Sequence, residues 1–155
     1  MAIGTDDVIE KFADTPTLLT SSTGSLAADG FVAVDGGNWT NSDDVPFAAF
    51  VLEVAWGTIP AAGRTVDLYG MPHDIQSTNE PRVPSLTYQH YFMGAFPLDT
   101  AASVSTAYRT FLPLVFLPNI KSGQPILFYI HNNTAQTLSA GWQLWITPKT
   151  QGPKA

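Results

Sequence analysis

The chain has 155 residues, a mass of 16.7 kDa and a formal net charge of −6, which suit a single domain with its own core. Its seven Lys and Arg residues are scattered, so no nucleic-acid partner is expected, because phosphate binding requires clustered basic side chains. The lack of cysteine excludes disulfides and thiolate metal sites. Charged residues make up only 13% of the chain. Such a surface suits burial against partner proteins, although an all-β protein with many neutral polar turns would have the same composition.

Residues 1–22 differ from the rest and are predicted to form an extended N-terminal arm, ahead of a sandwich domain at residues 23–155. Val8, Ile9 and Phe12 stand at helical spacing, which predicts one helical turn in the arm. An N-terminal strand that closes one edge of a sheet is the alternative.

The first residues, MAIGTDDVIEKF, have neither the basic start nor the apolar core of a signal peptide. No apolar run approaches the roughly 18 to 20 residues that cross a bilayer. We therefore expect a protein that is made in a cytoplasm and has no membrane partner.

Alternating apolar residues predict a core strand from Phe47 to Gly57, because successive side chains of a strand point to opposite faces. One face carries the larger residues, which are expected in the core: Phe50, Leu52, Val54 and Trp56. In the next strand, from Thr65 to Gly70, Val66 and Leu68 are expected on one face and Asp67 and Tyr69 on the other.

The stretch from Met71 to Ser85 contains three prolines, which predict a long loop rather than a central strand or a helix. Its aliphatic residues, among them Ile75 and Val83, predict that this loop lies against another surface. Alternation then resumes from Thr87 to Asp99.

The stretch from Tyr108 to Pro118 is apolar nearly throughout, which predicts a strand with both faces covered. Pro113 lacks a backbone N–H and favours an edge or a bulge at this point. The last two predicted strands, Ile126 to Ile130 and Trp142 to Thr147, are interpreted as a closing hairpin. Tyr129 and Trp145 are expected to form an outward aromatic pair on it for a neighbouring subunit.

Seven or eight strands separated by turns of Gly, Pro, Asn and Asp predict an all-β protein, a β-sandwich with jelly-roll topology as the preferred form. No internal repeat is found.

Catalytic and ligand-binding motifs are absent from the sequence. The three histidines are far apart and match no metal-ligand spacing, and His131 is expected in a turn or at the surface. No nucleophile elbow or phosphate-binding loop is present either. We therefore predict no catalytic residue, no cofactor, no metal and no enzymatic activity.

Three stretches of the chain resemble the small virion proteins of tailed bacteriophages that decorate or cement the capsid. They are MAIGTDDVIEKF, SDDVPFAAFVLEVAW and PNIKSGQPILFYIHNNTAQTLSAGWQLWITPKT. The resemblance implies a jelly roll or related sandwich, no enzymatic activity, and dimers or trimers on the exterior of a capsid assembled in the host cytoplasm. It implies the major capsid protein and sister copies as partners.

The arm and the long loop are the predicted contact elements, together with the aromatic pair. The candidate interaction residues are Ile3, Val8, Ile9, Phe12, Ile75, Val83, Tyr129 and Trp145. The alternative function is a carbohydrate-binding or host-adhesion module of a phage tail or virion, in which aromatics stack on surface glycans. Its candidate residues are Trp39, Tyr69, Tyr88, Tyr91 and Trp145.

Overall fold

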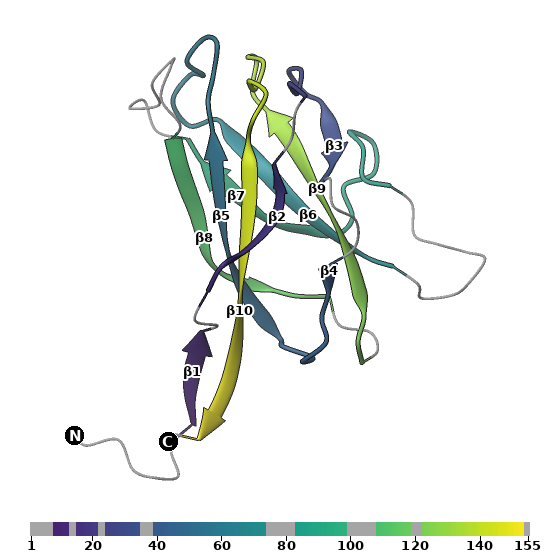
Figure 1. Ribbon diagram of the computed structural model, residues 1–155. Coiled ribbons are helices and arrows are strands. Elements are labelled where there is room, and N and C mark those ends of the chain that lie inside the picture. The colour runs from purple at the N-terminus through teal and green to yellow at the C-terminus, as the bar shows by residue number, and fades with distance from the viewer. Residues whose placement is uncertain are drawn as a thin grey trace.

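The computed structural model describes residues 8–12, 15–21, 24–34, 39–73, 83–98, 108–118 and 122–153. Within these ranges the chain forms ten β-strands and no helix. The strands make two five-stranded antiparallel sheets that pack face to face (Figure 1). The predicted all-β sandwich is therefore confirmed.

The first sheet has the strand order β1-β10-β5-β8, and β2 pairs with β10 as well. Its strands are β1 (Val8–Phe12), β2 (Thr17–Ser21), β5 (Phe47–Val54), β8 (Tyr108–Phe116) and β10 (Gln143–Pro153). The second sheet has the order β3-β9-β6-β7, and β4 also pairs with β9. Its strands are β3 (Phe31–Ala33), β4 (Trp39–Thr40), β6 (Thr65–Pro72), β7 (Phe92–Pro97) and β9 (Pro125–Asn133). Both sheets interleave strands from the two halves of the chain, as double Greek-key arrangements do. The jelly-roll form itself stays a prediction.

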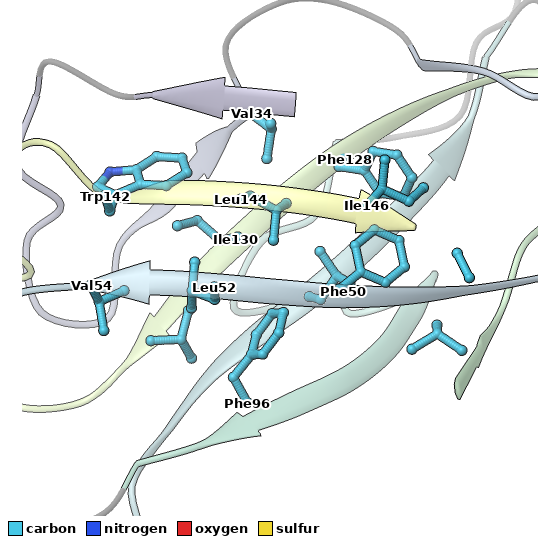
Figure 2. Packing of buried hydrophobic residues seen from close by; sticks show 14 of the residues in the cluster. Val34, Phe50, Leu52, Val54, Phe96, Phe128, Ile130, Trp142, Leu144 and Ile146 are labelled. Carbon is cyan, nitrogen blue, oxygen red and sulfur yellow. The ribbon is translucent and has the colours of Figure 1, made fainter. Parts of the chain in front are cut away.

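The core lies between the sheets and is built from the inward face of each alternating strand (Figure 2). On β5, every second side chain is buried, and the predicted inward set is fully shielded from solvent: Phe50, Leu52, Val54 and Trp56. Val66 and Leu68, predicted to share one face of their strand, both point into the same core. The inward faces of β9 and β10 are also confirmed: Ile126, Phe128, Ile130, Trp142, Leu144 and Ile146.

The N-terminal arm is extended where the structure describes it, and the predicted helical turn is wrong. Val8–Phe12 forms β1, which pairs with residues 149–153 of β10, and Thr17–Ser21 forms β2. Because β10 is longer than the sandwich body, its free backbone groups offer the arm a ladder that a single helical turn cannot match. The alternative of an N-terminal edge strand is confirmed. Figure 1 shows β1 and the end of β10 projecting together from the sandwich.

The predicted closing hairpin is also wrong, because β9 and β10 belong to different sheets. Residues 134–142 join them, whereas hairpin loops usually have two to five residues. Asn132 is fully buried and its side-chain amide donates to the carbonyls of Leu26, Ala27 and Gln136. Leu138 bridges to both Leu26 and Trp56. These bonds anchor the connection across the end of the sandwich, so the chain crosses from one sheet to the other.

The long loop is shorter than predicted at its start, because β6 continues through Pro72 and pairs there with Ile126. Its residues 74–82 lie outside the described ranges. The strand expected from Thr87 begins only at Phe92, after an isolated bridge between Ser85 and Tyr88.

Pro113 lies in an edge strand, next to an irregularity in the pairing, as the sequence predicted. β8 is the last strand of the first sheet, and its pairing with β5 shifts register between Ala48 and Phe50, opposite the stretch that contains Pro113. A bulge on an edge strand accommodates the missing N–H without leaving a ladder partner unsatisfied.

Candidate functional site

Four apolar side chains form a continuous row across the outer face of the first sheet, named here the outer stripe. Leu18 of β2 lies opposite Trp145 of β10, Trp145 opposite Val51 of β5, and Val51 opposite Phe111 of β8. Directly opposed residues have Cβ atoms about 5 Å apart, so the four side chains are neighbours. Leu18 is 40% and Phe111 65% exposed, while Trp145 and Val51 are half-buried.

A second pair of rings lies further along the same two strands. Phe47 of β5 and Phe116 of β8 have ring centroids 4.7 Å apart at 60°. Phe116 is the most exposed large apolar residue described, at 73%. The prediction that both faces of this strand are covered is therefore wrong for the single chain, since its outward face is open at Phe111 and Phe116.

A polar row borders the stripe on its other side. Gln143 lies opposite Glu53, and Glu53 opposite Arg109. The Arg109 Nε donates to the Glu53 Oε2 at 2.5 Å, so the two charges beside the stripe compensate each other. The pair is exposed on the Arg109 side, and exposed pairs contribute little to folding stability.

A hollow of about 480 Å³, which we call the arm pocket, opens on this face. Thr15 and Pro16, at the start of β2, form one wall. Val51, Trp145 and Arg109 form the rest, so two members of the outer stripe line the pocket. Its walls offer an apolar floor, one guanidinium and one hydroxyl, which suits an apolar side chain better than a reacting group.

A second hollow of about 420 Å³ lies at the junction of β7 and β8, where an edge of each sheet meets the other. Its lining is mainly apolar: Gly70, Tyr91, Phe92, Met93, Leu114, Val115, Phe116 and Pro118. The Met93 sulfur packs directly against the Cα of Gly70, where a Cβ would displace it.

The outer face of the second sheet differs, because the chain covers it itself. Tyr69, Met71 and Tyr129 form a small buried cluster there, packed by Phe31, Ala33, Tyr91 and Leu127. Burial raises the pKa of Tyr69, and the nearby Asp67 charge raises it further. Tyr129 is only 7% exposed and lies on the opposite side of the sandwich from Trp145, so the expected outward aromatic pair is wrong.

The sequence predicted His131 in a turn or at the surface, and this prediction is wrong. His131 is buried in the covered outer face of the second sheet. Its ring stacks on Phe31 with centroids 4.1 Å apart, and its Nδ1 is 3.4 Å from the Asp67 Oδ2. Asp67 accepts hydrogen bonds from Thr65 Oγ1 at 2.7 Å and Asn133 Nδ2 at 3.2 Å. Among the described residues, no three His, Asp or Glu side chains gather as metal ligands would.

The predicted interaction residues are thus distributed over several surfaces. Trp145 is part of the outer stripe, and Val83 is 56% exposed at the beginning of the described segment 83–98. For Val8, Ile9 and Phe12 the structure describes the backbone, which pairs with β10. Ile3 and Ile75 lie outside the described residues.

Sequence reasoning missed Leu18, Val51 and Phe111 as candidates for a contact surface, although the alternation placed Val51 on the outer side of its strand. Their signal is weak, since each is an ordinary strand residue, and only the register of four strands brings them into one row. The outward position of Val51 was readable from the alternation of β5.

No protein-family model matches the chain, and no curated protein is detectably similar to it. Over the part of the chain that the structure describes, there is no helix long and apolar enough to cross a membrane.

Proposed function

We propose that the chain is a non-enzymatic structural protein of a virion, which binds to the exterior of a tailed-phage capsid and stabilises it through contacts with neighbouring subunits. The observation that carries the proposal is the outer stripe, a row of apolar side chains across β2, β10, β5 and β8 whose two end members, Leu18 and Phe111, are exposed. Contiguous exposed apolar surface of this kind marks protein–protein interfaces.

The exposed rings would make such a contact favourable. Phe111 is 65% exposed, and covering its exposed area would contribute on the order of 3 kcal/mol at about 25 cal/mol per Å². The cost of exposing it in a free monomer is difficult to explain if the chain acts alone. The choice of a phage capsid comes from the resemblance of three sequence stretches described above, and within this proposal the interleaved strand order supports a jelly roll.

The carbohydrate-binding alternative has less support. None of its five candidate aromatics is exposed: Tyr69 is buried, and Trp39, Tyr88, Tyr91 and Trp145 are intermediate. Among the residues whose side chains are described, the exposed large apolar rings are those of Phe92, Phe111 and Phe116. Phenylalanine has no polar atom with which to orient a sugar hydroxyl.

The test is co-sedimentation of the purified protein with empty capsids assembled without it. We expect saturable binding and a higher melting temperature of the capsid shell. A glycan array run on the same preparation separates the two readings, because a decoration protein should bind no glycan. Failure to bind capsids, together with specific binding of one glycan class, would overturn the proposal.

A further inference from the structure

We propose that the outer face of the first sheet binds the same face of a second copy of this chain, with the Phe111 side chain of each copy entering the arm pocket of the other. The inference rests on the proposed function, because it names the contact through which sister copies would assemble. It replaces the arm and the loop, which the sequence favoured, with a sheet face.

A projection and a hollow lie side by side on this face. Phe111 is 65% exposed on β8, and its direct cross-strand neighbour Val51 lines the arm pocket of about 480 Å³. A two-fold axis between projection and hollow places each ring over the other copy's pocket, so both are filled in one closed pair. If they lay on different faces, the same contact would repeat head to tail and build an open filament.

The charges of the face also fit a second copy. A two-fold contact sets a surface against itself, so a face with uncompensated charge of one sign would repel its own copy. Beside the stripe, Arg109 and Glu53 form a compensated pair 2.5 Å apart, and the four stripe residues are uncharged. Lys149, opposite Phe47 at one end of the face, is the other charged residue described there and is only 6% exposed. The whole chain carries −6, and a face without net negative charge avoids the repulsion between two copies.

The size of the apolar area sets the extent of the contact. Phe111 and Phe116 together expose on the order of 270 Å², taking roughly 200 Å² for a whole phenylalanine. A stable complex buries about 800 Å² per partner. The contact therefore has to cover the full outer face, from the pair Glu53–Arg109 to the pair Phe47–Phe116.

Pairing of the free edge of β8 with the same edge of a second copy is disfavoured. Pro113 lies in β8 and has no N–H to donate, and the pairing of β8 with β5 is irregular at this point. Both features are ways in which proteins blunt an edge against backbone pairing. The exposed side chains of β8 are consequently better suited to a face-to-face contact.

Sedimentation velocity of the full chain tests the inference. We expect the wild type to be a dimer and Phe111→Ser to be a monomer with an unchanged circular dichroism spectrum. The matched control is Leu86→Ser, which removes a side chain that is 59% exposed but lies in the segment 83–98, away from the first sheet. It should remain a dimer. A monomeric wild type or a dimeric Phe111→Ser would overturn the inference.

A second experiment decides the matter if Phe111→Ser does not fold. The chain has no cysteine, so F111C and L86C each provide one unique thiol. A short bis-maleimide should link two copies of F111C and leave L86C as single chains; absence of linked F111C overturns the inference. The two proposals fail separately: a monomer that co-sediments with capsids leaves only the proposed function, and a dimer that ignores capsids leaves only the dimer contact.

Discussion

Leu144 and Trp145 are consecutive residues of β10 that point to opposite sides of the first sheet, Leu144 into the core and Trp145 into the outer stripe. Leu144 has no solvent exposure, whereas Trp145 is half-buried and lines the arm pocket. One of these two neighbours therefore packs the core, and the other faces the proposed contact surface.

Trp145→Ser should weaken assembly more than folding. We expect the dissociation constant of the oligomer to rise at least tenfold, which corresponds to about 1.4 kcal/mol, with a smaller loss in the free energy of unfolding of the monomer. Leu144→Ala is the contrast and should cost roughly 2 to 5 kcal/mol of folding stability, because it opens a cavity. Denaturant titration at low protein concentration, combined with sedimentation, measures both. A monomer destabilised equally by the two changes would contradict the assignment of Trp145.

Asn132→Ala should destabilise the fold by roughly 3 kcal/mol, because it removes three hydrogen bonds at about 1 kcal/mol each, to carbonyls that each keep one other donor. The matched control is Asn133→Ala, one residue along. Asn133 is only half-buried and donates to the Thr65 hydroxyl and the Asp67 carboxylate, so its loss should cost about 1 kcal/mol. Urea denaturation gives both values. Equal costs would show that the crossing between sheets does not depend on Asn132.

Pro113→Val should increase aggregation without loss of folded structure. Valine restores a backbone N–H and favours regular pairing, so the free edge of β8 becomes a template for other strands. Light scattering during slow heating should show that the variant begins to aggregate at a lower temperature than the wild type. Pro46→Val serves as the control, since Pro46 precedes β5 and is not in an edge strand. Identical onsets for wild type and Pro113→Val would contradict a protective role.

Protonation of the Asp44 carboxylate in acid should make the fold less stable. Its carboxylate accepts a hydrogen bond from the Ser122 hydroxyl at 2.6 Å and another from the Gly123 backbone N–H at 2.9 Å. These bonds hold the pKa of Asp44 below its usual range, the Ser122 bond contributing most. Because the folded-state pKa is lowered, the stabilisation is present above about pH 4 and is lost as the pH falls through the folded value.

Asn suits the left-handed backbone at this position, so Asp44→Asn tests the charge alone. The variant should have a lower melting temperature than the wild type at neutral pH, and the difference between the two melting temperatures should shrink in acid. Melting curves from pH 7 down to pH 3 check this. A difference that is constant over the whole range would show that the Asp44 charge does not stabilise the fold.

Much of the sandwich was predictable from the sequence, because the period of alternation in β5 and β6 defines an inward face without any knowledge of the partners. Phe50 was assigned to the core and Val66 and Leu68 to a common face on this basis, correctly. The sheet to which a strand belongs was not predictable in the same way. β9 and β10 both alternate as hairpin strands would, and the long-range contacts of Asn132 and Leu138 that hold the crossing between the sheets have no local signal.

The candidate site was less predictable than the fold. Trp145 was assigned to an outward surface, but Phe111 stands in a strand that is apolar nearly throughout, so no alternation marks its exposed face. The row from Leu18 to Phe111 depends on three strand registers at once. Such registers come from tertiary packing and have no local signature.

The pairing of β1 with the end of β10 determines how the fold would respond to a mechanical load. Val8 lies opposite Pro153, and Phe12 opposite Lys149, so force applied to the two outer ends pulls the strands apart from that end inward. The hydrogen bonds of this ribbon run between the strands, in line with such a force, and would break one after another rather than together. Tension through the chain's two ends should peel β1 away at low force, while the sandwich body, held by its core, would resist until much higher load.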